Sequence, residues 1–75
     1  MDKKAIAYYN NGILDTIFIY DILYDIDTFV LYKHIRQKRL YKSKIKYDRQ
    51  GNAYFITYGS KYYLSEFLRL EGQEN

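Results

Sequence analysis

Acidic side chains keep to odd positions between residues 15 and 28, while the even positions carry only Ile, Tyr, Phe and Thr. A period of two residues is typical of a β-strand, and aromatic and β-branched residues favour the pleated backbone. On a helix, Asp21 and Asp25 would lie one turn apart and repel each other. We therefore predict a strand that turns near Asp25-Ile26-Asp27.

The rest of the chain alternates between short apolar runs and turn signals. Asp48-Arg49-Gln50-Gly51 has Asp at the first and Gly at the fourth position, as a type I turn prefers. Gly59-Ser60 predicts a two-residue type II′ hairpin. Arg36-Gln37-Lys38-Arg39 predicts a polar loop. These signals separate four further predicted strands: Thr28–Ile35, Leu40–Tyr47, Ala53–Tyr58 and Lys61–Leu64.

The two ends of the chain give separate signals. Asn11-Gly12 favours a turn between strands 5–9 and 13–18, because both residues tolerate positive φ; a short first helix from Asp2 to Gly12 is the alternative. Near the other end, Ser65 predicts the N-cap of a short C-terminal helix. Glu66 would lie in its first turn, Arg69 in its last turn and Gly72 just beyond it.

These elements predict a mainly β fold (β-rich α+β), a small twisted antiparallel meander sheet or small barrel of four to six strands with a short C-terminal helix. A chain of 75 residues is expected to form a single small domain, residues 1–75. It has no Cys, so neither a disulfide nor a thiolate metal site is available, and its 11 Tyr and 4 Phe must supply much of the buried area. Homodimerisation is a second way to stabilise so small a domain.

The charged residues exclude a membrane helix and are unevenly distributed along the chain. The apolar stretch 13–32 carries four Asp residues, whose cost in a bilayer excludes a membrane helix. The N-terminal residues lack a signal-peptide pattern, so we expect a cytoplasmic protein, in the host cell if a phage encodes it. Residues 32–50 hold eight Lys or Arg and one Asp, a net charge of +7, whereas the whole chain carries +3.

The basic residues share one face of the predicted sheet. Lys42, Lys44 and Lys46 are two residues apart, so they form a row with neighbours about 6.6 Å apart. Tyr41, Ser43, Ile45 and Tyr47 then point into the core. If the turns close as predicted, Lys46 faces Tyr54, Lys44 faces Ile56, Lys42 faces Tyr58, Tyr58 pairs with Lys61 and Ile56 with Tyr63. The candidate nucleic-acid-binding residues are Lys33, Arg36, Lys38, Arg39, Lys42, Lys44, Lys46, Lys61, Tyr54, Tyr58 and Tyr63.

Ammonium groups beside exposed rings are typical of proteins that bind single-stranded nucleic acid, because the cations neutralise phosphates and the rings stack on bases. The leading hypothesis is therefore a non-catalytic module that binds DNA or RNA, and the basic hairpin could also enter a major groove as a two-stranded ribbon. A solvated sheet face has the same Lys and Tyr composition and is the alternative interpretation of these residues.

Two other functions stay open. The acidic edge formed by Asp15, Asp21, Asp25 and Asp27, or the aromatic face, could bind a host protein as an inhibitor. The single histidine, His34, shares a face with Val30 and Tyr32, which predicts a core or rim position. A small ribonuclease toxin using His34, Arg36 and a Tyr is the third hypothesis. The pattern D-x-[DN]-x-[DN]-G of calcium loops is absent, as are phosphate-loop and zinc patterns, so we expect no metal, no cofactor and no catalytic residue.

In composition the whole chain resembles the small accessory proteins of phages, prophages and plasmids of AT-rich Gram-positive bacteria. The features are abundant Tyr, Ile, Lys and Asn, no Cys, Trp or Pro, and the tyrosine-rich run from Asn52 to Leu68. The resemblance implies roles such as host takeover, control of the element's own genes, or inhibition of a host defence such as a CRISPR nuclease. It assigns no functional residue.

Overall fold

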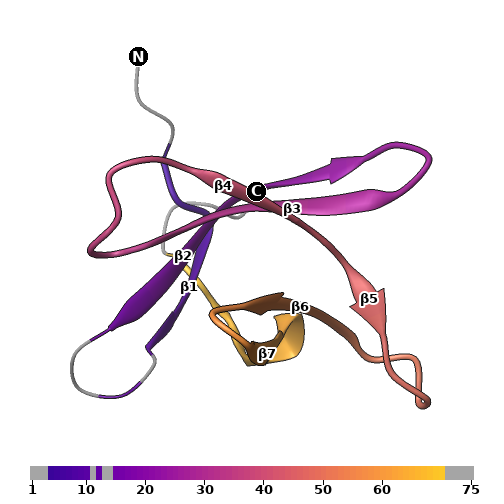
Figure 1. Cartoon of the computed structure of the whole chain (residues 1–75). Coiled ribbons are helices and arrows are strands. Elements are labelled where there is room, and N and C mark those ends of the chain that lie inside the picture. The colour runs from indigo at the N-terminus through magenta and orange to yellow at the C-terminus, as the bar shows by residue number, and fades with distance from the viewer. Residues whose placement is uncertain (1–3, 11, 13–14, 71–75) are drawn as a thin grey trace.

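The computed structural model describes residues 4–10, 12 and 15–70, which form two antiparallel sheets (Figure 1). The five-stranded sheet has the order β4-β3-β2-β1-β8, and the three-stranded sheet has the order β5-β6-β7. The strands are β1 Ala7–Asn10, β2 Thr16–Tyr24, β3 Thr28–His34, β4 Tyr41–Lys44, β5 Lys46–Tyr47, β6 Ala53–Thr57, β7 Ser60–Tyr63 and β8 Leu68–Arg69. The predicted mainly β, antiparallel fold is confirmed, and the sheets do not close into a barrel.

The N-terminal segment is a strand. β1 pairs antiparallel with β2, so Ala7 lies opposite Ile19 and Asn10 opposite Thr16. The prediction of a strand over 5–9 is therefore confirmed for residues 7–9, the strand continues to Asn10, and the alternative of a helix is wrong there. Of the predicted Asn11-Gly12 turn, Asn11 lies outside the described residues, and Gly12 has the positive φ of +82° that such a turn needs.

A β-bulge at Tyr20 reverses the alternation of β2. Ile19 pairs with Tyr32, but the next pair is Asp21 with Leu31, so Tyr20 is the extra residue. Before the bulge the odd residues Ile17 and Ile19 are buried, whereas beyond it the even residue Ile22 packs against the core. The predicted strand and its turn at residues 25–27 are confirmed, but its apolar residues do not all share one face.

The predicted strand 40–47 is divided between the sheets. β4 pairs with β3 and β5 pairs with β6, and Ile45 between them is buried, with its N–H donating to the Thr28 carbonyl at 2.8 Å. Figure 1 shows the chain running out of one sheet along β4 and directly into the other. The predicted pairs Lys44 with Ile56 and Lys42 with Tyr58 are therefore wrong. They required β4 to pair with β6 across the turn at Asp48, whereas β4 pairs with β3.

Of the two turns in the three-stranded sheet, the first is as predicted and the second is not. Gly51 N–H donates to the Asp48 carbonyl at 3.0 Å, and Lys46 lies opposite Tyr54 as predicted. The turn of the next hairpin lies one residue earlier than predicted, at Tyr58 and Gly59, with φ of +53° and +76°, so the strand pairing is two residues out of the predicted register. Positive φ at both residues is the type I′ pattern, not type II′. Ile56 therefore pairs with Lys61, and Tyr63 pairs with Tyr54.

The predicted C-terminal helix is a single 3₁₀ turn, η1 (Leu64–Glu66), with Tyr63 at its N-cap and no side-chain cap from Ser65. The chain then extends again, and Leu68 and Arg69 form β8 against Tyr8 and Ala7 of β1. Pairing with the open edge of β1 supplies the hydrogen bonds that a second helical turn would have supplied. Gly72 lies outside the described residues.

Aromatic and β-branched residues fill the space between the sheets. The buried cluster comprises Ile17, Ile19, Val30, Tyr32, Ile45, Phe55 and Tyr62. Phe55 is fully buried, and its ring centroid lies 5.0 Å from that of Tyr32. Tyr41 lies opposite the buried Tyr32 on the core side, with ring centroids 6.2 Å apart, but it is 42% exposed. Tyr47 is 62% exposed, so neither tyrosine is buried as predicted.

Candidate nucleic-acid interface

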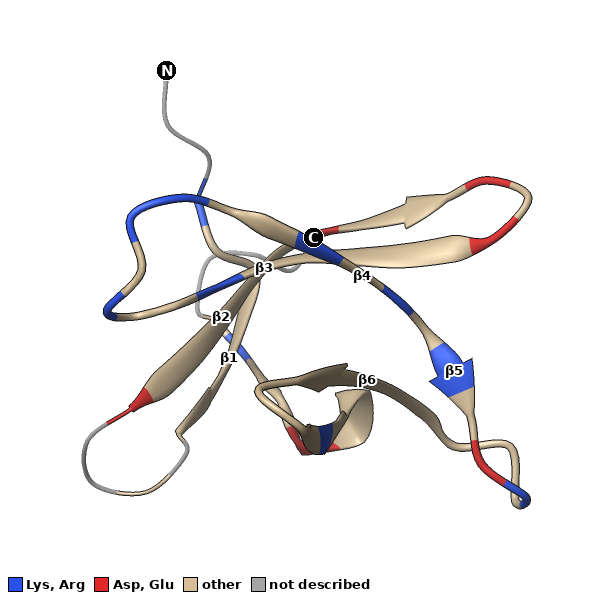
Figure 2. Cartoon of the chain, in the orientation of Figure 1, with Lys and Arg blue, Asp and Glu red and all other residues tan. Residues whose placement is uncertain are grey.

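The outer face of the five-stranded sheet carries the first group of predicted cations. Lys42 lies opposite Leu31, and Lys44 lies opposite Phe29. Lys33 is two residues beyond Leu31 on the same strand, so it shares this face, as the alternation predicted. Figure 2 shows the cations following the loop after β3, then β4 and β5.

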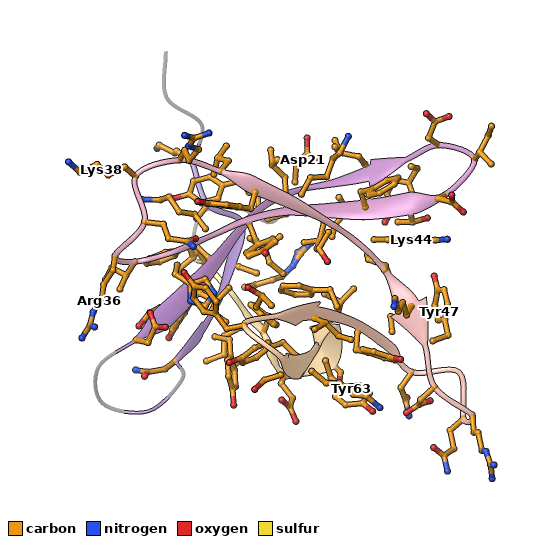
Figure 3. The ribbon with its side chains drawn as sticks, viewed as in Figure 1. Asp21, Arg36, Lys38, Lys44, Tyr47 and Tyr63 are labelled. Carbon is orange, nitrogen blue, oxygen red and sulfur yellow. The ribbon has the colours of Figure 1, made fainter. Side chains whose placement is uncertain are left out.

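The second group lies on the opposite side of the molecule. Lys46 faces Tyr54, Tyr54 faces Tyr63, and Lys61 faces Ile56 on the outer face of the three-stranded sheet. The sheets pack their inner faces together, so their outer faces point in opposite directions. In Figure 3 the outward-pointing Asp21 of β2 lies at the top and Tyr63 of β7 at the bottom. The structure therefore divides the predicted single face into two.

Local contacts hold several of these cations. The Lys42 Nζ lies 5.0 Å from the centre of the Phe29 ring, and the Lys61 Nζ lies 4.8 Å from the centre of the Tyr54 ring. Lys44 forms a half-exposed ion pair with Asp27 at 3.6 Å. Such exposed contacts contribute little to stability, so the charges stay available for a phosphate.

The loop between β3 and β4 presents the exposed cations Arg36, Lys38 and Arg39. Figure 3 places Arg36 and Lys38 at the end of the molecule opposite Lys44. Gln37 anchors this loop: its Oε1 accepts the His34 N–H at 3.1 Å, and its Nε2 donates to the Tyr58 hydroxyl at 2.6 Å. The loop cations are therefore displayed from an anchored turn, continuous with the β4 lysines.

Tyr58 does not join Tyr54 and Tyr63. Its place in the β6–β7 turn sets its ring against His34, with centroids 4.5 Å apart, while 72% of the residue remains exposed. Tyr54 and Tyr63 do lie together, with ring centroids 5.4 Å apart. Because the turn lies at Tyr58-Gly59 and not at Gly59-Ser60, Tyr58 belongs to the turn and is separated from Tyr54 and Tyr63.

The sequence interpretation missed the aromatic residues on the outer face of the five-stranded sheet. Phe18 lies opposite both Tyr8 and Lys33 on that face. Its ring centroid lies 6.5 Å from that of Tyr20, and Phe29 follows on β3 beneath Lys42. None of these four rings belongs to the buried cluster. The only sequence signal was the change of phase between Ile19 and Ile22, which a bulge explains.

Asp48 and Tyr63 form an electrostatic pair beside the three-stranded sheet. The Asp48 Oδ1 accepts the N–H groups of Asn52 and Gln50, each at 2.9 Å. The hydrogen bond from the Asn52 backbone is the largest of the causes that lower the pKa of Asp48. Desolvation, followed by the nearby Asp48 carboxylate, raises the pKa of Tyr63 above 10.0. Both groups therefore keep their usual charges near neutral pH.

The predicted acidic edge is not a single edge. The Asp15 carboxylate is held by His34 at 2.9 Å, and the Asp21 Oδ1 accepts the Ile22 N–H at 2.8 Å within β2. Asp25 and Asp27 are exposed at the turn between β2 and β3. The same turn displays Ile26, which is 98% exposed. The tip of this hairpin therefore combines exposed apolar surface with negative charge.

His34 is buried, as predicted, and both of its ring nitrogens have partners. Nδ1 contacts the Asp15 Oδ2 at 2.9 Å, and Nε2 contacts the Thr57 Oγ1 at 3.2 Å. The Tyr32 hydroxyl donates to the same Thr57 oxygen at 3.1 Å. With His34 only 2% exposed, the imidazole has no nitrogen directed at solvent. This arrangement favours a structural histidine over a general base of a ribonuclease.

The chain matches no protein family model, no curated protein and no solved structure. Within residues 4–10, 12 and 15–70, no three His, Asp or Glu side chains gather closely enough to hold a metal ion. No helix in that part of the chain has the length and apolar character needed to cross a bilayer.

Proposed function

We propose that the protein binds single-stranded nucleic acid on the outer face of its five-stranded sheet. The observation that carries this proposal is the mixture of side chains on that face. Lys33 and Lys42 lie beside Phe18, Phe29 and Leu31, and these three apolar side chains are partly exposed. Antiparallel sheets that bind single strands use this combination, with rings stacking on bases and ammonium groups neutralising phosphates.

The loop after β3 extends the proposed site. Arg36, Lys38 and Arg39 are exposed, and none forms an ion pair with another described residue. A strand of nucleic acid crossing the sheet from β2 toward β4 would reach these cations and Lys42 at once. The two aromatic neighbours Phe18 and Tyr20 would then lie under its bases.

The test is a titration of fluorescent single-stranded and duplex DNA and RNA at low and at physiological salt. We expect saturable binding to single strands that weakens steeply as salt rises. The double variant Lys42→Glu/Lys44→Glu should lose binding at physiological salt. Each phosphate contact removed lowers the salt slope by about 0.7 for single strands, so this variant should lower it by about 1.4.

The matched control is Lys46→Glu/Lys61→Glu, which makes the same change of charge on the opposite outer face. Because that face does not bind in our proposal, this variant should retain most of the affinity. Equal losses in the two variants would show attraction to the net charge alone, and absence of binding by the folded wild type at low salt would refute the proposal.

The tip of the β2–β3 hairpin supports a second function, the inhibition of a host protein. Ile26 and Tyr24 are 98% and 80% exposed, and Asp25 and Asp27 flank Ile26. Exposed apolar side chains projecting from a tight turn are typical of residues that fill a pocket on a partner. The flanking carboxylates suit a basic channel such as a nucleic-acid enzyme of the host contains.

The two proposed functions predict different results for the same variants. Inhibition of a purified host nuclease should be lost in Ile26→Ser/Tyr24→Ser and retained in Lys42→Glu/Lys44→Glu. The reverse pattern, with nucleic-acid binding intact in the hairpin variant, supports the sheet face as the working surface.

A further inference from the structure

The core of the protein is open at one end of the five-stranded sheet. A groove of about 350 Å³ lies on the inner face of that sheet, between the β1–β2 pair and the segment that carries η1 and β8. Its lining residues are Ile6, Ala7, Ile19, Ile22, Leu64, Phe67 and Arg69. A hollow of this volume is within the range of small-molecule sites, and it lies far from the outer face proposed to bind nucleic acid.

Six of the seven described residues that line the groove have apolar side chains. Ile6, Ile22, Leu64 and Phe67 pack against the buried cluster, yet each remains only partly buried. The neighbouring backbone groups are already used, since Ile6 N–H donates to the Ile19 carbonyl at 2.7 Å and Leu70 N–H donates to the Ile6 carbonyl at 3.2 Å. A small domain leaves this much apolar wall in contact with water at a cost in stability, which a bound apolar group would offset.

Among the described residues that line the groove, Arg69 alone is charged. It lies opposite Ala7, and Ala7 lies opposite Ile19, so the three residues form a row across β8, β1 and β2. Arg69 is exposed and forms no ion pair with any carboxylate in the described part of the chain. A guanidinium at the rim of an apolar groove is complementary to a ligand with an apolar body and a carboxylate head.

We infer that this groove binds a small amphiphilic carboxylate, a short fatty acid or a similar alkyl acid, with its chain against Ile22 and Leu64 and its carboxylate on Arg69. Binding there would close the open end of the core and join β8 more firmly to β1. The ligand is thus recognised by length and head-group charge, because Arg69 is the polar side chain among the described lining residues.

Three probes with the same number of carbon atoms test this inference: octanoate, octanol and octylammonium, each titrated below its micelle concentration or solubility limit. Methyl NMR of the full chain should show saturable shifts at Ile6, Ile22 and Leu64 with octanoate, weaker ones with octanol and none with octylammonium. Arg69→Gln should reduce the affinity for octanoate by about tenfold and leave the affinity for octanol unchanged. Lys61→Gln removes the same charge from the other sheet and should change neither.

Ala7→Leu places a larger side chain in the groove and should abolish binding of octanoate and octanol without changing the far-ultraviolet circular dichroism. Octanoate shifts that do not saturate, that lie outside the groove, or that survive Ala7→Leu would overturn the inference. Equal affinity for octanoate and octylammonium would overturn the role of Arg69. A groove filled by another part of the chain or by a second copy would give no shift, which also overturns it.

Discussion

The hydroxyl of Thr57 links two buried polar side chains, and its removal provides a sharp test of the core. It accepts a hydrogen bond from the Tyr32 hydroxyl at 3.1 Å and lies 3.2 Å from the His34 Nε2. Because the Asp15 carboxylate can only accept a hydrogen bond, a neutral His34 carries its proton on Nδ1, and Nε2 is left to accept the Thr57 hydroxyl proton. Thr57 thus supplies a hydrogen-bond partner to both Tyr32 and His34.

Thr57→Val keeps the shape and the β-branch of the side chain but leaves both partners without a hydrogen bond. Tyr32, His34 and Thr57 are all at most 7% exposed, so water does not reach the vacated position easily. An unsatisfied buried group costs about 1–3 kcal/mol, and two of them cost about 2–6 kcal/mol. A 75-residue domain has a free energy of unfolding of about 4–11 kcal/mol, so this substitution removes a large part of it.

The matched control is Thr57→Ser, which retains the hydroxyl and loses one methyl group, for a cost of about 1 kcal/mol. Urea unfolding followed by circular dichroism measures both variants, and an unchanged dependence on urea shows that the native compactness is retained. We expect the Val variant to be less stable than the Ser variant by at least 1 kcal/mol. If the two free energies agree within about 0.5 kcal/mol, the hydroxyl does not hold the network.

A double-mutant cycle sharpens the same test. Thr57→Val leaves the Tyr32 hydroxyl without its acceptor, and Tyr32→Phe removes that hydroxyl. In the double variant, therefore, the His34 Nε2 is the one member of this network without a partner. The destabilisation of Tyr32→Phe/Thr57→Val should therefore be smaller than the sum of the two single effects. Additive effects would mean that the Tyr32 hydroxyl gains little from Thr57.

Three further predictions concern acid stability, turn strain and stacking. Because the folded-state pKa of Asp48 is lowered, its carboxylate stabilises the fold above about pH 4, and this contribution is lost as the pH falls through the folded-state pKa. The difference in urea midpoint between wild type and Asp48→Asn should thus narrow from pH 5 to pH 2; a constant difference contradicts this account. Gly59→Ala should cost about 1 kcal/mol in thermal or urea unfolding, since φ is +76° and a Cβ meets nothing within 4 Å; a loss above 3 kcal/mol would indicate a clash instead. Phe18→Ala should weaken binding of single-stranded nucleic acid by about tenfold in the fluorescence titration, whereas Tyr54→Ala on the opposite face should not; equal effects would count against the sheet face.

Local signals predicted the strands and most turns of this protein. The turn at residues 25–27, the type I turn at Asp48 and the burial of Val30 and His34 all followed from two-residue alternation and turn chemistry. These features depend on residues close together in the sequence, so the sequence contains the information that specifies them.

Three features could not be predicted because they depend on contacts between distant segments. The bulge at Tyr20 arises where β2 pairs with β3, and it moved Phe18 and Tyr20 to the outer face. The Tyr58-Gly59 turn holds a non-glycine residue at positive φ, and the contacts of Tyr58 with His34 and Gln37 offset that strain. The strand β8 replaced a helix because the edge of β1 was open to it.

The bend at Ile45 determines how the basic segment can work. Lys44 and Lys46 both point outward, but they belong to different sheets, because Ile45 between them is drawn into the core. A flat ligand therefore cannot lie on the whole lysine row that alternation predicts. It can lie on Lys42 with the rings of the five-stranded sheet, or on Lys46 with Tyr54. The rings beside Lys42 span three neighbouring strands and continue into the cationic loop, so the longer binding track lies on the five-stranded sheet.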